Sequence, residues 1–404
     1  MLGVFFLIIV FFALNQAIFN VYQKRHKFFD KKKMNLLYFY HLFFYGVYSW
    51  YAYNNPSDSG VYYKRAHQHE GTWFELLGVD ATFIEFLAYP FAKMGFNYDM
   101  VMVCFAWLGY MGFVYAYLFF RERIPIKIKV FKSVDLLTLI LFLPNMHFWT
   151  ASLGKGSAIF FGLMMFTYAI SKPGSRLFLL TLGSIIIYFI RPHVFLFVAV
   201  GAVAGYMSGK EAIPLWQKIT MFVGLLGGLI ILQDQILSMG GIQGSENLIK
   251  DFESFTKDRS EDLENAGSGV DISSYSLPLK LFTFWFRPLF IDAPNILGII
   301  VSFENLIYLM LFLKVIKKDF IKFILKSPAL VKMSFVIFFT TSFAMTFVMS
   351  NLGIIMRQKS MVMYYIFFVI YYYLAEKKYK NIIQAKKIKK YREQKARTLA
   401  ANPN

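Results

Sequence analysis

The sequence predicts an all-α, polytopic transmembrane helix bundle of about eleven spans. Of its 404 residues, 57% are hydrophobic and 20% are aromatic, whereas only 17% are charged. The apolar runs repeatedly approach the roughly 20 residues that a helix needs to cross a bilayer. The charged residues gather in short clusters between these runs, whereas a soluble domain of this length needs charge over its whole surface.

The distribution of charge predicts the orientation of the chain. The net charge of +19 does not indicate nucleic-acid binding, because the basic residues lie mainly in short loops and a tail beside apolar runs, which is typical of cytoplasmic loops. Segment 24–33 holds six basic residues and one acidic residue, so we expect it in the cytoplasm and the N-terminus outside. Residues 54–97 hold five acidic and three basic residues, as expected for the outer face.

The apolar runs give the order of the spans. Met1 to Tyr22 lacks a basic n-region and a small-residue cleavage site, so we interpret it as a retained first span. The other spans are expected at about 34–53, 98–120, 134–150, 157–170, 177–190, 194–207, 216–232, 296–313, 333–350 and 361–375. Arg191-Pro192-His193 separates two of them, because proline marks a bend; a single kinked span is the alternative, and it would reverse every later loop.

Three loops are expected outside, at 54–97, 234–295 and 351–360. The first contains an amphipathic stretch from Trp73 to Phe91, which predicts an interfacial helix lying on the bilayer. The second is the longest polar segment, with ten acidic and five basic residues over 234–292. Residues 1–375 then form one integral membrane domain, and 376–404 form a basic cytoplasmic tail. We interpret this tail as a topological anchor; a helix against anionic lipid is the alternative.

Several cations lie at the outer ends of the predicted spans, where orientation does not require them. A lipid-linked phosphate or diphosphate at the outer leaflet would explain them, since Arg binds phosphate with a planar fork and Lys as a point charge. The alternative is that each side chain reaches lipid headgroups or pairs with a nearby carboxylate. The candidate phosphate- and glycan-binding residues are Arg65, Lys155, Arg191 with His193, Arg287 and Arg357.

Asp58, within the polar insert from Asn54 to Ala66, is the candidate catalytic residue. Its carboxylate can take the proton from an acceptor hydroxyl, which is a weak nucleophile without a base. The alternative is ordinary turn chemistry, because Pro56-Ser57-Asp58-Ser59-Gly60 is a common turn composition. Tyr62 is a candidate for stacking on a sugar face, with an interfacial aromatic as the alternative.

The sequence predicts no metal site and no cofactor. His67 and His69 are two positions apart and do not share a helix face, so we interpret them as structural or solvated. Cys104, the single cysteine, lies in a predicted span and excludes a disulfide framework. Zinc-protease, P-loop and dinucleotide-binding motifs do not occur.

Four segments in this order resemble a known family. A basic first loop and a second span precede the pair Asp58 and Tyr62. They are followed by His147 to Ala158 with its cation and small-residue helix start, by Ile190-Arg191-Pro192-His193, and by the segment from Asn351 to Lys359. This layout resembles the exopolysaccharide polymerases and Wzy-type O-antigen polymerases, which are polytopic GT-C-like glycosyltransferases.

The resemblance implies an enzyme that joins polyprenyl-diphosphate-linked glycan units at the outer face of the bacterial inner membrane, without a nucleotide sugar. Its partners would be the lipid-linked glycan, membrane lipids and polysaccharide export or chain-length proteins. A flippase for a lipid-linked oligosaccharide is an alternative; it would need polar residues near mid-span and two-fold repeats, and neither is evident in the sequence. A non-catalytic membrane protein of an envelope assembly is a second alternative.

Overall fold

The computed structural model is all-α apart from one short β-hairpin in its described residues, which confirms the all-α part of the prediction. It describes residues 2–210, 275–293, 295–347 and 351–401, together with 214–216, 218–219, 222–223 and 226–228. For residues 360 and 388–401 only the backbone is described. Most of the predicted span 216–232 and of the predicted loop 234–295 therefore lies outside the described residues.

The first half of the chain forms long helices with a compact helical insert. The elements are α1 (Leu2–Arg25), α2 (Lys31–Asn54), α3 (Asp58–Gln68), a 3-10 turn η1 (Trp73–Leu76), α4 (Ala81–Lys93), α5 (Tyr98–Arg123), β1 (Lys129–Val130), β2 (Val134–Asp135), α6 (Leu136–Leu141), α7 (Pro144–Thr150) and α8 (Lys155–Ile170). β1 and β2 pair antiparallel, with Val130 opposite Val134. Pro144 begins α7, which is why the apolar run 134–150 is divided between two short helices.

The second half continues in the same way. Its elements are the 3-10 turn η2 (Pro173–Ser175), α9 (Leu177–Ile190), α10 (Pro192–Ser208), α13 (Leu277–Phe286), α14 (Ile296–Leu313), α15 (Lys318–Leu325), α16 (Ala329–Thr346) and α17 (Leu352–Ala401). α17 bends by 52° between Lys359 and Met361. Arg191 separates α9 from α10, so the structure has two helices here and not one continuous helix.

Four described helices, α1, α5, α14 and α16, are long and apolar enough to cross a membrane, and the bent pair in α17 makes a fifth if it counts as one span. These helices indicate a multi-pass membrane protein. The remaining apolar helices are shorter, with at most 17 residues. α2 is as long as α1, but it contains three lysines, one histidine and six tyrosines. The structure therefore does not show the eleven spans expected from the sequence.

Close contact between α10 and α16 depends on glycines that are spaced four residues apart. A Cβ atom at Gly205 would lie 2.5 Å from the carbonyl oxygen of Ala329, and one at Gly201 would lie 2.4 Å from Ile337 Cγ1. Small residues at this spacing let two helix backbones approach, as in membrane helix pairs. α10 thereby holds Arg191, at its N-terminal end, in a fixed place beside the bundle.

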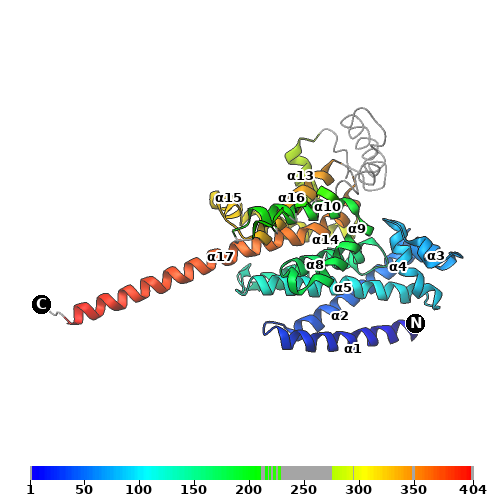
Figure 1. Cartoon of the computed structure of the whole chain (residues 1–404), viewed down its shortest axis with the longest axis horizontal. Helices are drawn as coiled ribbons and strands as arrows, with labels where there is room; N and C mark the ends of the chain where they lie inside the picture. Colours follow the sequence, from blue (N-terminus) through cyan, green and yellow to red (C-terminus); the bar gives the residue numbers. More distant parts are fainter. Residues whose placement is uncertain are drawn as a thin grey trace.

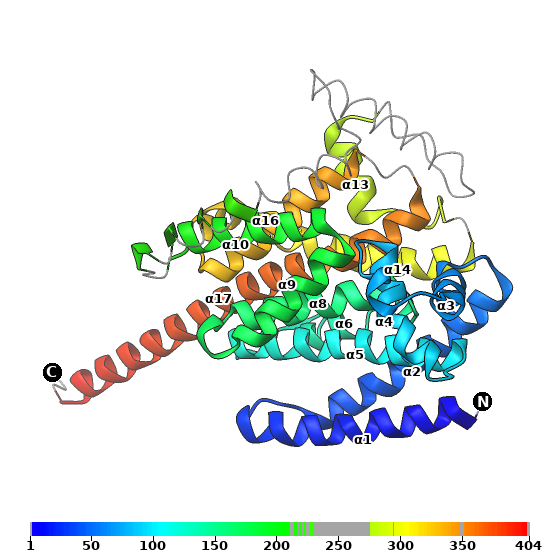
Figure 2. The same ribbon diagram turned by 45° about the vertical axis from the view of Figure 1, so that its right-hand side comes forward.

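The long helices run along one axis, so the bundle has two ends. Figures 1 and 2 place α3, α4 and the N-terminus at one end and the C-terminus at the other. The basic segments that connect the helices lie at the C-terminal end, where Lys172 and Arg176 both pair with Glu122. Lys378 Nζ donates to the carbonyl of Lys127 at 3.0 Å at the same end. We call this the basic end and the other the α3 end.

Two segments predicted as external loops are wholly or partly helical. Most of the polar insert 54–66 forms α3, because Ser57 acts as N-cap and Asp58 places a carboxylate in the first turn. Most of the predicted loop 351–360 forms the start of α17, where the Asn351 side chain accepts a hydrogen bond from the amide of Ile354. The predicted interfacial helix is divided into η1 and α4 by residues 77–80.

Candidate functional site

A cluster of charged residues lies at the α3 end, where several helices begin. Asp58 is the first residue of α3, Asp80 immediately precedes α4, Lys155 is the first residue of α8, and Arg191 immediately precedes α10. Helix N-termini carry a partial positive charge and free amide groups, so their convergence favours an anion. We call this set the cation cluster, after its basic residues, although it also includes two carboxylates and a tyrosine. Its members are Asp58, Tyr62, Asp80, Lys155, Arg191, His193 and Arg357.

Asp58 and Arg357 form an ion pair across the cluster. Arg357 Nη1 donates to Asp58 Oδ2 at 3.0 Å. The guanidinium also lies over the Trp149 ring, 5.8 Å from its centroid. The Asp58 side chain remains 60% exposed. The carboxylate is therefore held by Arg357 on one side and open to solvent on the other.

Asp80 provides a second carboxylate, which pairs with Lys155. Its backbone has φ of 66° and ψ of −119°, a conformation that favours glycine. Its amide donates to the carbonyl of Phe189 at 2.7 Å, so the end of α9 holds this strained turn in place. Strain of this kind is retained where the surrounding structure enforces it, often at functional sites.

Arg191 is the buried cation of the cluster. The residue is 8% exposed, and its Nε atom has no hydrogen-bond partner. Among the described residues, no carboxylate lies within ion-pair distance of its guanidinium. Burial lowers the pKa of Arg191 to about 10, and the positive charge of Arg357 adds to this effect, so the group remains protonated at neutral pH. A buried, charged and unpaired guanidinium is costly, and an anionic ligand would compensate it.

Tyr62 and His193 complete the cluster in different ways. Tyr62 is 5% exposed, and Gly154 lies beside its ring, so little of the ring is open in this structure; its stacking on a sugar face stays a prediction. Burial raises the pKa of Tyr62 to about 12, with the charge of Asp58 as the second cause, so its hydroxyl stays protonated and can only donate or accept a hydrogen bond. His193, the second residue of α10, lies within electrostatic reach of Arg191, Asp80 and Lys155.

Two predicted site residues have their contacts elsewhere. Arg65 donates to Glu85 of α4 at 3.3 Å and thus ties α3 to α4. Arg287 pairs with Asp292 and donates to the hydroxyl of Tyr275. Among the described residues, no hydrogen bond or ion pair links either of them to the cation cluster. Their predicted role in binding phosphate stays a prediction, with a structural contact as the simpler explanation.

A buried polar network connects α7, α14 and α17 inside the bundle. Glu304 is 2% exposed and accepts hydrogen bonds from the Asn145 amide, at 2.7 Å, and from the Tyr308 hydroxyl. Lys359 is fully buried and donates to Asn305 Oδ1 at 2.6 Å and to the carbonyl of Arg287 at 2.8 Å. Glu304 lies in the middle of α14, so a polar residue does occur near mid-span, although none was evident in the sequence.

This network fixes the direction in which Arg357 points. On a helix, residues two apart project about 200° from each other, because each residue turns the chain by about 100°. Lys359 points into the network, and Arg357 consequently projects toward α3 and Asp58. Asn145 strengthens the arrangement, since its side chain donates to the carbonyl of Met356 at 2.9 Å and accepts from Trp149 at 3.1 Å.

The described residues contain no group of three or more His, Cys, Asp or Glu side chains that could hold a metal ion. His67 stacks on Tyr63 with a centroid distance of 5.5 Å. His69 lies 3.7 Å from a carboxylate oxygen of Glu75. The two histidines thus make separate contacts.

Sequence reasoning missed Asp80, Glu304 and the burial of Lys359. Asp80 follows Gly78-Val79 before a helix, which is an ordinary helix start in sequence, and its positive φ is visible only in the fold. Glu304 could have been recognised in the sequence, because a single carboxylate within an apolar span needs a buried partner.

No protein-family model, no curated protein and no solved structure matches the chain.

Proposed function

We propose that the protein is a membrane glycosyltransferase that joins polyprenyl-diphosphate-linked glycan units during the synthesis of a surface polysaccharide. The observation that carries this proposal is Arg191, a buried guanidinium without an ion-pair partner among the described residues, next to Arg357, Lys155 and two carboxylates. A diphosphate supplies the negative charge that this arrangement lacks. The carboxylates supply the base that an acceptor hydroxyl needs.

The reaction follows from these roles. Asp58 removes the proton of an acceptor sugar hydroxyl as its oxygen forms a bond to the anomeric carbon of the donor. The bond between that carbon and the diphosphate oxygen breaks, and the diphosphate leaves with the electron pair. Arg191 and Lys155 stabilise the charge that builds up on the leaving group. Arg357 holds Asp58 and stays close enough to the phosphate to contribute.

We further propose that the α3 end faces the outside of the bacterial inner membrane and that the basic end is cytoplasmic. The grouping of basic connections at one end supports this orientation. In an eleven-span topology the N-terminus lies outside and the tail after residue 375 lies in the cytoplasm. Polysaccharide export or chain-length proteins would then meet the chain at the α3 end.

The test measures polymer length in cells whose surface polysaccharide depends on this chain. We expect Arg191→Gln to shorten or abolish the polymer while the protein stays in the membrane. Lys64→Gln is the matched control, because Lys64 is an exposed cation on α3 outside the cluster. In vitro, purified protein in nanodiscs should bind a synthetic polyprenyl diphosphate, and Arg191→Gln should lose this binding. Normal polymer together with unchanged binding in Arg191→Gln would refute the proposal.

Two buried ionisable groups inside the bundle, Glu304 and Lys359, favour a second candidate, a flippase for a lipid-linked oligosaccharide. Ionisable groups inside a membrane domain often mark a transport pathway. Vesicles containing the purified protein distinguish the two functions. Movement of a labelled lipid-linked glycan across the bilayer without a new glycosidic bond would support the flippase, and bond formation without such movement would support the transferase.

A further inference from the structure

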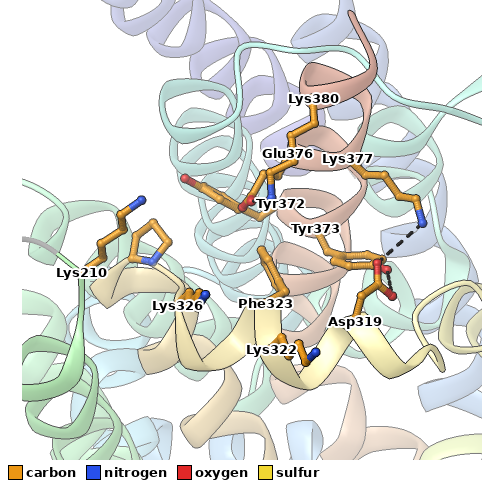
Figure 3. A pocket seen from close by; sticks show the side chains of 11 residues that line it. Lys210, Asp319, Lys322, Phe323, Lys326, Tyr372, Tyr373, Glu376, Lys377 and Lys380 are labelled. Atoms are coloured by element: carbon orange, nitrogen blue, oxygen red, sulfur yellow. Dashed lines mark hydrogen bonds and ion pairs between the residues drawn. The ribbon is translucent and has the colours of Figure 1, made fainter. Parts of the chain in front are cut away.

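A basic pocket opens at the basic end of the bundle, about 580 Å³ in volume. Figure 3 shows that its walls come mainly from α15 and α17, with Lys210 from the segment just after α10. Two carboxylates, Asp319 and Glu376, line it together with several lysines. The lysines are Lys210, Lys322, Lys326, Lys377 and Lys380. The cation cluster lies at the opposite end, so this pocket is a separate site.

The ion pairs within the pocket leave three lysines uncompensated. Lys377 Nζ lies 3.7 Å from Asp319, and Lys380 Nζ lies 2.5 Å from Glu376. Lys210, Lys322 and Lys326 have no ion pair within the described parts of the chain. Three ammonium groups that line one cavity repel each other, and a multivalent anion would relieve this repulsion.

The floor of the pocket is aromatic and firmly packed. Phe323 packs on Tyr373 with a centroid distance of 5.1 Å, and the Tyr373 hydroxyl donates to Asp319 at 2.9 Å. α15 is thus fixed against α17, and the spacing of the lysines on α15 is fixed relative to the pocket. The anion would therefore meet a formed site.

α15 also indicates the kind of anion. Ile321 and Leu325, four residues apart, are each 69% exposed and form an apolar strip on this helix. Lys322 and Lys326, also four residues apart, form a basic strip beside it. A helix with adjacent apolar and basic strips lies in the membrane interface, with acyl chains against one strip and headgroups at the other. A phospholipid satisfies both strips, whereas a soluble phosphate satisfies only the lysines.

We propose that this pocket binds the headgroup of an anionic phospholipid from the leaflet at the basic end, with an acyl chain lying along Ile321 and Leu325. The lysines bind the phosphate and Phe323 contacts the glycerol region. Positively charged pockets between membrane helices recognise anionic headgroups through this combination of charge and shape. The proposal does not depend on the reaction at the cation cluster, because it uses none of the residues there.

The experiment compares full-length variants in detergent by native mass spectrometry, with phosphatidylglycerol and phosphatidylcholine in competition. We expect the wild type to retain phosphatidylglycerol selectively. In the triple variant Lys210→Gln, Lys322→Gln, Lys326→Gln the preference for phosphatidylglycerol over phosphatidylcholine should fall at least about tenfold. Each lysine near an anionic lipid surface increases lipid affinity several-fold. The matched control is Lys127→Gln, Lys129→Gln, Lys132→Gln, which removes the same charge from exposed positions outside the pocket and should stay selective.

Two further experiments distinguish binding of a lipid from binding of a soluble anion. Ile321→Ser with Leu325→Ser keeps all lysines and should weaken retention of phosphatidylglycerol. Glycerol phosphate, which has the same headgroup chemistry without acyl chains, should not displace the lipid at equal concentration. Equal selectivity of the two lysine triples would overturn the proposal, and so would full displacement by glycerol phosphate. Thermal denaturation of each variant in phosphatidylcholine confirms that the compared proteins are folded.

Discussion

Arg357 donates a hydrogen bond to Asp58 across 3.0 Å and so joins two residues that are 299 positions apart in the chain. The ion pair brings the start of α3 against the first part of α17. It also connects the candidate base with one of the cations expected to bind phosphate. The remaining cluster residues are arranged around this pair.

Reversing this ion pair should separate its structural role from its chemical role. Asp58→Arg with Arg357→Asp keeps an attraction between α3 and α17, so we expect thermal stability to change by less than about 1 kcal/mol. Polymer formation should nevertheless be lost, because the base and the cation have exchanged places. Lys64→Gln, which changes an exposed cation on α3 outside the cluster, is the control and should preserve polymer length. Polymer formation by the Asp58 and Arg357 exchange variant would contradict a chemical role.

The two carboxylates of the cluster should differ in their kinetic effects. We expect Asp58→Asn to lower kcat about 10²- to 10⁴-fold with little change in KM, as for loss of a general base. Asp80→Asn should chiefly raise KM, because Asp80 positions Lys155. Steady-state kinetics with a purified lipid-linked donor provide both parameters. If the two effects are exchanged, Asp80 is the base.

Asp80 should be a position where glycine is better tolerated than alanine. Its φ of 66° and ψ of −119° strain a side chain with a Cβ atom, at a cost of about 1–3 kcal/mol. Asp80→Gly removes this strain, whereas Asp80→Ala keeps it and loses the ion pair with Lys155. We expect the glycine variant to unfold at a higher temperature than the alanine variant in detergent. Equal unfolding temperatures would show that the turn is relaxed.

Arg191 should reduce the stability of the protein in the absence of ligand. Arg191→Met removes a buried, unpaired charge and keeps most of the side-chain volume, so we expect an equal or higher unfolding temperature. A polyprenyl diphosphate should raise the unfolding temperature of the wild type but not that of Arg191→Met. A loss of stability in the variant without ligand would show that Arg191 already has a compensating partner.

The buried network should show strong coupling between Glu304 and Lys359. Glu304→Leu and Lys359→Met each remove one of two buried groups that interact electrostatically without a direct hydrogen bond, and each leaves the hydrogen-bond partners of the lost group unsatisfied, so each should be clearly destabilising. The double variant removes both charges and should cost clearly less than the sum. A double-mutant cycle from thermal denaturation measures the coupling. Additive costs would show that the two groups act independently.

Hydropathy predicted the long elements well and the polar connections less well. α1, α5 and α14 lie close to their expected ranges, because a long apolar run has few alternatives to a helix. The segments that became α3 and the start of α17 looked like loops, since their polar composition hides the caps Ser57 and Asn351. The shorter apolar runs could not be assigned as spans, because helices of at most 17 residues can cross, tilt or stop within a membrane domain.

The candidate site was only partly predictable for a related reason. Topology alone suggested that Lys155, Arg191, His193 and Arg357 share an end with Asp58, and the structure brings them together. Sequence gave no indication that Arg65 would pair with Glu85, because both lie on polar stretches with several possible partners. The strained turn at Asp80 depends on a hydrogen bond to Phe189, which is more than 100 residues away in sequence.

α17 has a consequence for the thickness of the membrane. It carries Arg357 at the cation cluster and Tyr373 at the basic pocket, sixteen residues farther along. At about 1.5 Å per residue these positions are about 24 Å apart along the helix, close to the roughly 30 Å of a bilayer's hydrocarbon core. One helix thus sets the distance between the proposed diphosphate site and the proposed headgroup site. Lipids with longer acyl chains would stretch this spacing, and the 52° bend between Lys359 and Met361 is where α17 can adjust to the hydrophobic mismatch.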